Sequence, residues 1–127
     1  PVFSPESKAE VPIIATLPNP KRPQKSIRIM GQIDRLSSNN NEICIVDFKT
    51  NRIVPSSVSE IAHVYLYQLA AYRLALQQIF VDRPIHAGIL WTETPKITEI
   101  PNEILEKYTN ELWTLDLDDL DSKINGF

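Results

Sequence analysis

The first half of the chain alternates apolar and polar residues in a way that predicts strands. Ser26–Leu36 (SIRIMGQIDRL) alternates with period two, typical of a strand with one buried face. Ile43–Thr50 is apolar and β-branched until its end and predicts a central strand, and the polar Ser37–Glu42 between them predicts a turn. Ala9–Thr16 predicts an edge strand because a proline lies near its start, and the proline-rich Leu17–Lys25 predicts a loop. Within the longest alternation, one face carries Ile27, Ile29, Gly31 and Ile33, and the other carries Arg28, Met30, Gln32 and Asp34.

In the second half of the chain, the spacing of apolar residues changes to that of a helix and then back to that of strands. Ser56–Ser59 offers N-cap residues, and apolar residues then recur at helical spacing from Glu60 to Phe80, which predicts a long helix. Pro84 prevents its continuation. Two strands and a second helix are predicted after it, at Ile85–Thr92, Lys96–Ile100 and Pro101 to about Leu115. This order predicts an α/β fold: a mixed β-sheet that starts with an antiparallel hairpin, continues through a crossover helix and carries flanking helices.

Composition and charge narrow the class of protein. A chain of 127 residues with 43% hydrophobic and 23% charged residues has the size and balance of one soluble domain, which we expect to span residues 1–127. The net charge of -3 makes it a poor stand-alone binder of duplex DNA. With a single cysteine, Cys44, the chain cannot form an internal disulfide or a cysteine-held zinc or iron–sulfur site. The sequence has no phosphate-binding glycine loop, so we expect no ATP site.

The ends of the chain suggest its context. No apolar run is long enough for a membrane span, so we expect a cytoplasmic protein without membrane contact. The chain begins with Pro1 and no signal-peptide pattern follows, so we expect a piece of a longer protein. Asp116–Phe127 is acidic and is predicted to fray.

The informative chemistry lies at the end of the third predicted strand. Period two places Asp47 and Lys49 on one face there. If Asn40–Asn41 forms a two-residue type I′ turn, Asp34 of the preceding strand lies opposite Asp47, with the Cβ atoms about 5 Å apart. Two carboxylates that close repel unless a cation intervenes, and a divalent metal is the natural cation. The alternative is a surface cluster of charges, or a register that separates the carboxylates.

The long predicted helix adds polar residues to the same region. Gln68 and Tyr72 lie four residues apart and so share a face, with Tyr65 on the same side. Such residues are common at the boundary of an amphipathic helix. Following the Asp-x-Lys strand, they are also suited to contact a phosphate backbone.

Three blocks in this order carry a family resemblance. Residues 31–36 (GQIDRL), 45–52 (IVDFKTNR) and 68–76 (QLAAYRLAL) resemble the RecB-type branch of the PD-(D/E)XK nucleases. Residues 87–93 (AGILWTE) also resemble the last core strand of the AddA subunit of bacterial AddAB helicase–nucleases, alphaproteobacterial ones in particular. The resemblance implies a restriction-endonuclease-like core and a metal-dependent DNA exonuclease that processes double-strand breaks for recombinational repair.

The resemblance also implies roles for individual residues. Asp34, Asp47 and the Phe48 carbonyl would bind Mg²⁺ or Mn²⁺, and Lys49 would be the catalytic lysine. Gln68, Tyr72 and Arg52 would support the site and the DNA, and Glu10 falls where many relatives carry an acidic residue. The implied partners are broken DNA ends, a single strand fed by a helicase, the rest of the helicase chain and an AddB-like subunit. The alternative is an inactive DNA- or subunit-docking module on the same fold.

The sequence departs from the family in one respect. Relatives usually carry a metal-binding histidine on a helix before the first strand, whereas here His63 and His86 both lie too far downstream. Either the chain was cut after that helix or this member lacks it. We favour the cut, and expect the isolated chain to be weakly active or inactive.

Other residues fit simpler interpretations. The basic residues Lys21, Arg22, Lys25 and Arg28 are interpreted as a solvated loop, with contact to a DNA backbone as the alternative. Trp91 and Trp113 are predicted to lie in the core, and Cys44 is predicted to be a small buried residue facing away from Asp47.

Overall fold

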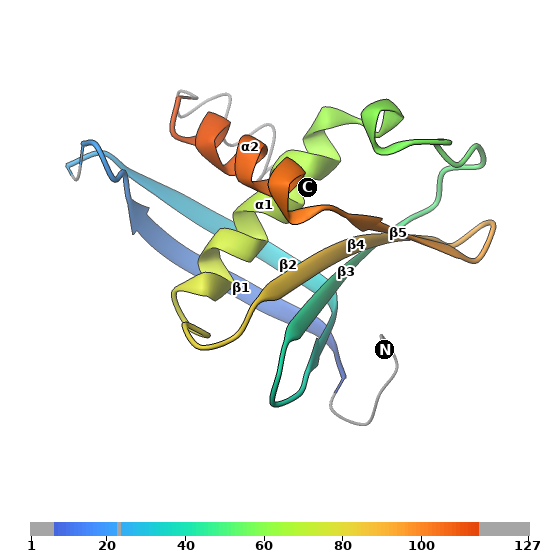
Figure 1. Ribbon diagram of the computed structural model, residues 1–127, viewed down its shortest axis with the longest axis horizontal. Helices are drawn as coiled ribbons and strands as arrows, with labels where there is room; N and C mark the ends of the chain where they lie inside the picture. Colours follow the sequence, from blue (N-terminus) through green and yellow to red (C-terminus); the bar gives the residue numbers. More distant parts are fainter. Residues whose placement is uncertain (1–6, 23, 115–127) are drawn as a thin grey trace.

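The computed structural model describes residues 7–22 and 24–114 and shows one five-stranded sheet with helices on one face (Figure 1). The elements in chain order are β1 (Lys8–Pro18), β2 (Ser26–Ser38), β3 (Ile43–Lys49), the 3-10 helix η1 (Val58–Glu60), α1 (His63–Gln77), β4 (Ile85–Trp91), β5 (Lys96–Ile100) and α2 (Asn102–Leu112). The strand order is β1-β2-β3-β4-β5; β3 and β4 are parallel, and the other neighbours are antiparallel. The predicted mixed α/β sheet with its hairpin and crossover helix is confirmed.

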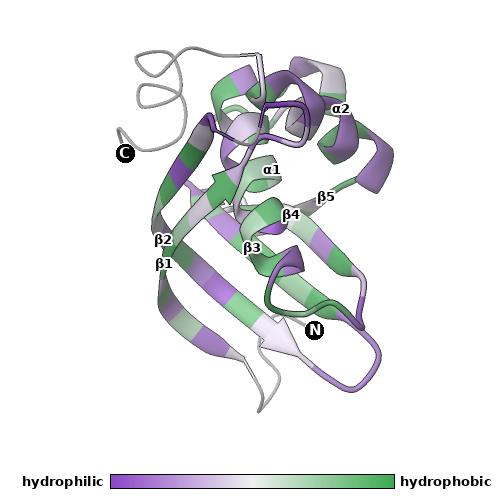
Figure 2. Cartoon of the chain, turned by 90° about the vertical axis from the view of Figure 1, so that its left-hand side faces the viewer, coloured by the Kyte–Doolittle hydropathy of each residue, from purple (hydrophilic) through white to green (hydrophobic). Residues whose placement is uncertain are grey.

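The core lies between the helices and one face of the sheet. In the parallel pair, Ile43 and Ile45 on β3 and Ile85 and Ile89 on β4 are at most 1% exposed. Apolar residues of both helices pack on them, and the hydropathy colouring shows green residues gathered where the helices meet the strands (Figure 2). Because strands β3 and β4 are parallel, α1 has to cross the sheet between them, which fixes its position over the core.

The β1–β2 pair contains a local irregularity beside the hairpin. The register pairs Ala9 with Arg35 and Val11 with Ile33, and no pairing joins Glu10 and Asp34 between them. Glu10 has φ 54°, a left-handed conformation that costs energy for a residue with a side chain. Before the irregularity the buried positions of β2 are Ile27, Ile29 and Ile33, whereas beyond it the adjacent residues Leu36 and Ser37 are both buried. Strict period two, as predicted from the sequence, therefore does not hold along the whole strand.

The long helix starts later than predicted. Glu60 belongs to the short helix η1, where its carboxylate accepts hydrogen bonds from the backbone N–H and the hydroxyl of Ser56. Ile61 is then extended, with ψ 138°, and it is 3% exposed. Burying Ile61 in this conformation interrupts the helix, and α1 begins at His63 without a side-chain cap. It ends at Gln77, whereas the prediction extended to Phe80.

The remaining boundaries differ by smaller amounts. β1 continues through Leu17 and Pro18, which were predicted as loop, because the pairs Leu17–Ile27 and Pro18–Ser26 extend the ladder. Pro101 is the N-cap of α2 rather than its first residue. The predicted end of α2 near Leu115 and the acidic segment after it lie outside the described residues.

The described helices lack the features of a membrane span. Neither α1, with 15 residues, nor α2, with 11, has the length and apolar character that crossing a bilayer requires.

The strained backbone of Glu10 yields a stability prediction. Replacing Glu10 by glycine removes the steric penalty of the left-handed conformation, so Glu10→Gly should raise the free energy of unfolding by up to about 1 kcal/mol. The matched control is Ala9→Gly, one residue earlier on the exposed start of the same strand, which should lower the free energy of unfolding by roughly 0.5–1 kcal/mol. Urea unfolding of the two variants measures both changes, and a loss of stability in both would show that Glu10 is not strained.

Candidate active site

The side of β3 that faces the core begins with isoleucines and ends with charged residues. Ile43 and Ile45 on this side are followed at the same spacing by Asp47 and Lys49. Asp47 is 6% exposed, so its carboxylate lies in the interior beside the core rather than in solvent. Burying a charge is costly unless neighbouring groups compensate for it. The neighbours of Asp47 therefore define the site.

Asp34 lies beside Asp47, in the register that the sequence predicted. Leu36 pairs with Ile45 in the β2–β3 hairpin, and continuing that ladder by two residues brings Asp34 opposite Asp47. Asp34 Oδ2 accepts a hydrogen bond of 2.7 Å from the backbone N–H of Phe48. This bond fixes one oxygen of Asp34 at the strand end.

The turn that sets this register is not the predicted type I′ turn. A type I′ turn needs positive φ at Asn40 and Asn41, and Glu10 is the one non-glycine residue with positive φ in the described part of the chain. Instead, the side-chain oxygen of Asn39 accepts hydrogen bonds from the backbone N–H groups of Asn41, at 2.8 Å, and Glu42, at 2.9 Å. A side chain thus replaces a backbone acceptor and closes the turn without changing the register.

The environment of Asp47 raises its pKa to about 6. Burial is the largest cause because it disfavours the charged form, and the adjacent Asp34 carboxyl raises the pKa further. Lys49 acts in the opposite direction, and its ammonium nitrogen lies 2.8 Å from Asp47 Oδ2. Asp47 Oδ2 is buried, so this ion pair with Lys49 takes the place of the water that the oxygen would otherwise bind.

Helix α1 positions Lys49 from the other side. Lys49 Nζ donates to Gln68 Oε1 at 3.3 Å and lies 4.3 Å from the centroid of the Tyr65 ring. The Tyr65 hydroxyl donates to Asn51 Oδ1 at 3.4 Å, which connects the segment after β3 to the same helix. The ammonium is therefore held between a carboxylate, an amide oxygen and an aromatic face.

A buried polar chain continues from Gln68 to β2. Gln68 is 4% exposed and donates through Nε2 to the Tyr72 hydroxyl oxygen at 3.4 Å. Tyr72 is 2% exposed, and burial raises the pKa of its hydroxyl. That hydroxyl lies directly against Gly31, where an added Cβ would overlap it. Gly31 therefore permits the close approach of Tyr72 to the sheet.

Sequence reasoning missed some residues of this site, and the structure leaves others outside it. The sequence placed Tyr65 on the correct helix face but gave it no contact with Lys49, and it gave no role to Asn51. The sequence analysis also missed that Gly31 makes room for the Tyr72 hydroxyl, although a glycine inside a strand pattern signals the close approach of another group. Arg52 and Glu10 are exposed, and the contacts found in the described residues do not connect them to the carboxylates; their roles stay predictions.

The histidines occupy other parts of the fold. His63 begins α1 and forms a hydrogen bond with Tyr108 of α2. His86 lies on β4, where its Nε2 is 3.3 Å from a Glu42 carboxylate oxygen.

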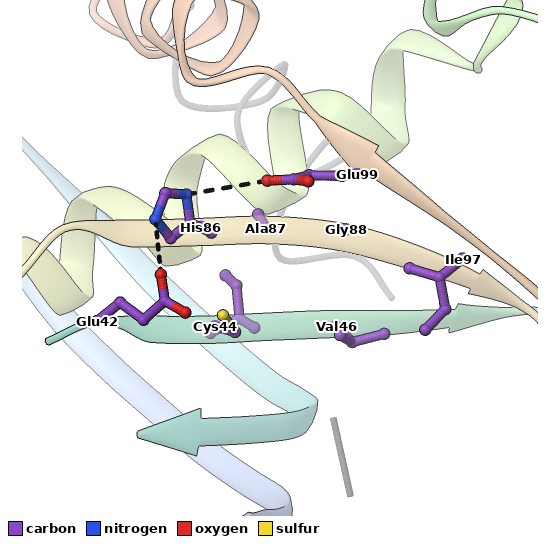
Figure 3. A pocket seen from close by; sticks show the side chains of 9 residues that line it. Glu42, Cys44, Val46, His86, Ala87, Gly88, Ile97 and Glu99 are labelled. Atoms are coloured by element: carbon purple, nitrogen blue, oxygen red, sulfur yellow. Dashed lines mark ion pairs between the residues drawn. The ribbon is translucent and has the colours of Figure 1, made fainter. Parts of the chain in front are cut away.

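A cavity of about 280 Å³ lies at His86 (Figure 3). It is lined by residues of β3 and β4, among them Cys44 on the face away from Asp47, and by Ile97 and Glu99 of β5. Cys44 faces away from Asp47 as predicted, but it is half-buried rather than buried because it borders this cavity. Burial is the main cause that raises the pKa of its thiol. This cavity is separate from the Asp–Lys site.

The donor set of the Asp–Lys site fits a hard divalent cation. Asp34 and Asp47 bring carboxylate oxygens to the same strand end, where the Phe48 N–H holds Asp34 Oδ2 and the Lys49 ammonium lies beside the buried Asp47 Oδ2. In the described ranges no three or more His, Cys, Asp or Glu side chains are arranged around a common metal position. Two carboxylates suit magnesium, which binds through one or two carboxylates and keeps several waters.

Comparison with known proteins identifies the family. The family model described as the PD-(D/E)XK nuclease superfamily matches residues 3–125. The chain belongs to this superfamily. Its members generally use divalent metals such as Mg²⁺, in keeping with the carboxylate pair. No curated protein matches the chain in sequence.

Two solved structures are similar in fold. The crystal structure of SSO0001 has 18% sequence identity and a TM-score of 0.47, with 84% of this chain and 50% of that chain covered. A protein from Eubacterium rectale described as a candidate exonuclease has 16% identity and a TM-score of 0.48, with 94% and 46% covered. The chain thus spans about half the length of these structures.

The close contact at Gly31 yields a prediction. Gly31→Ala places a methyl group where the Tyr72 hydroxyl lies, and overpacking of this kind costs about 1–3 kcal/mol of unfolding free energy. The double variant Gly31→Ala/Tyr72→Phe removes the overlapping oxygen and should recover most of the loss. Urea unfolding measures both, and no recovery in the double variant would contradict the assigned contact.

The raised pKa of Asp47 predicts a pH dependence of stability. The pKa of Asp47 is about 6 in the folded protein and near 4 in the unfolded chain, so the folded protein binds the Asp47 proton more tightly. The free energy of unfolding therefore falls as pH rises between about 4 and 6. In metal-free buffer, Asp47→Asn should remove this dependence and raise the free energy of unfolding at neutral pH by roughly 1–3 kcal/mol. Asp82→Asn, at an exposed aspartate, is the matched control. Unchanged pH dependence in Asp47→Asn would show that Asp47 ionises normally.

Proposed function

We propose that the chain is the nuclease domain of an AddA-type, RecB-like helicase–nuclease, and that it hydrolyses DNA phosphodiester bonds at the Asp34–Asp47–Lys49 site. The observation that carries the proposal is the convergence of two carboxylates and a lysine ammonium at the end of β3, with Gln68 of α1 bonded to that ammonium. A docking module has no need to bury Asp47 beside a second carboxyl group, and the cost of doing so favours a catalytic role.

The proposed mechanism assigns a task to each side chain. Asp34 and Asp47 would hold Mg²⁺ or Mn²⁺ with the Phe48 carbonyl, and the bound ion would supply charge stabilisation and an acidified water. In the hydrolysis, the oxygen of the attacking water would form a bond to phosphorus while the bond from phosphorus to the leaving sugar oxygen breaks. The attacking water would lose one proton to solvent, and the leaving sugar oxygen would take one up from solvent. Lys49 lies beside Asp47 and would neutralise the charge that develops on the phosphate oxygens. Gln68 would orient the Lys49 ammonium through its amide oxygen.

The proposed context is a longer enzyme. The chain would be one domain, 1–127, at the carboxyl-terminal part of a helicase chain that pairs with an AddB-like subunit. The helicase would feed a single DNA strand to this domain. Its substrate would be broken duplex ends, and its role would be the processing of double-strand breaks for recombination. The similarity of residues 31–36, 45–52 and 68–76 to RecB-type nucleases supports this subtype.

Substitutions in the intact helicase–nuclease test the proposed site. Asp47→Ala and Lys49→Ala should each reduce cleavage by at least about a hundredfold and leave ATP-driven unwinding unchanged, because they remove metal binding or charge stabilisation and not core packing. Cleavage and unwinding of the same labelled duplex are measured together, with Asp82→Ala as the control at an exposed acid. Full cleavage in Asp47→Ala would place the active site elsewhere and favour the docking module.

A further inference from the structure

A second surface with binding chemistry lies between the β1–β2 loop and the end of α2. A groove of about 870 Å³ is bordered there by Lys21, Arg22 and Lys25 of the loop and by Trp113 at the end of α2. Its other described lining residues are Asn, Pro and Thr, so the described wall carries three positive charges and no negative one. The sequence showed these cations without an aromatic partner; the tertiary structure brings Trp113 to them from 88 or more positions away along the chain.

Hydrogen bonds from one residue hold the loop in place. Asn19 Oδ1 accepts from the backbone N–H groups of Lys21, at 2.9 Å, and Arg22, at 3.3 Å. Its Nδ2 donates to the backbone carbonyl of Trp113 at 3.4 Å. The backbone of the loop is therefore held against the backbone of Trp113 before any ligand arrives, which lowers the ordering cost of binding.

The combination of groups selects a class of ligand. Lys21, Arg22 and Lys25 are exposed and can contact phosphates. Trp113 is half-buried: it packs against the core, where the sequence predicted it, and it also borders the groove. Cations along a groove with an aromatic wall are the elements that bind unpaired strands, whose bases are free to stack on a side chain. The bases of a duplex are already stacked and cannot reach the indole.

We infer that this groove binds single-stranded DNA, with phosphates on the loop cations and a base stacked on Trp113. The inference rests on the proposed nuclease function, because it supplies an anchor for the strand that the active site cleaves. The groove and the Asp–Lys site lie towards opposite ends of the sheet, as Figure 1 shows for the β1–β2 loop and the end of β3. Asp34 comes eight residues after Ser26 on β2, about 26 Å of extended strand. The strand would thus be held several nucleotides from the bond that is cut.

Tryptophan fluorescence tests the stacking contact directly. The chain has two tryptophans, and Trp91 is fully buried and donates to Thr98 Oγ1 at 2.9 Å. Adding oligothymidylate of about fifteen nucleotides in metal-free buffer of low ionic strength should therefore quench Trp113. The quenching should disappear in Trp113→Phe, and a duplex of the same length should quench far less. No quenching in the wild type, or equal quenching in Trp113→Phe, would overturn the inference.

A charge-matched pair of variants tests the phosphate contacts. Lys21→Ala/Lys25→Ala should weaken binding about tenfold and lower the slope of log affinity against log salt by about 1.4, since each phosphate contact on a single strand contributes about 0.7. Lys8→Ala/Lys96→Ala removes the same charge from exposed lysines on other elements and should leave both quantities nearly unchanged. Circular dichroism checks that each variant folds. If both double variants bound the DNA equally more weakly, the attraction would come from overall charge and not from this groove.

The outcome is separable from that of the proposed function. Binding is measured without metal, so it does not depend on cleavage. Quenching that needs Trp113, together with Asp47-independent cleavage in the intact enzyme, would leave the groove standing and reject the active site. Asp47-dependent cleavage without quenching of Trp113 would support the active site and reject the groove.

Discussion

The burial of the Asp47 carboxylate at the end of β3 is the constraint around which the rest of the site is arranged. A carboxylate that loses its water needs compensation, and here it comes from the Lys49 ammonium at 2.8 Å. Compensation is incomplete, because burial and the neighbouring Asp34 keep the pKa of Asp47 at about 6. A folded protein that maintains such an unfavourable arrangement has a use for it, and a divalent cation is the group that would relieve it.

The crossover helix makes this arrangement possible. Because β3 and β4 are parallel, α1 must pass over the sheet, and its apolar residues pack on the core along most of its length. Gln68 and Tyr72 are buried on the same helix as Leu66 and Leu69, so these polar groups need partners inside the protein. Gln68 finds them in Lys49 and in the Tyr72 hydroxyl, while Tyr72 packs against Gly31, which ties the position of the ammonium to the packing of the helix.

Charge is distributed unevenly over the molecule even though its net value is only -3. Of the two carboxylates in the proposed chemistry, Asp47 is buried and Asp34 is half-buried near the end of β3, while Lys21, Arg22 and Lys25 gather at the loop between β1 and β2. An acidic domain that acts on DNA needs local positive surfaces, since overall charge repels the phosphate backbone. The proposed groove would meet that need, and the helicase portion of the proposed parent enzyme would deliver the strand.

The sequence by itself determined the element order, the hairpin register and the polar residues of the candidate site. These follow from local rules: period two puts Asp47 and Lys49 on one face, and a short turn puts Asp34 opposite Asp47. The sequence did not determine how the turn is closed, because Asn39 could supply a side-chain acceptor in place of positive φ at the next two residues. Nor did it reveal the irregularity beside Glu10 or the late start of α1, which depend on strain and on the burial of Ile61. The tertiary structure alone placed Tyr65 beneath the Lys49 ammonium, Tyr72 against Gly31 and Trp113 beside the basic loop. Those contacts join residues distant in the chain, and packing of the helices on the sheet, rather than any local pattern, decides them.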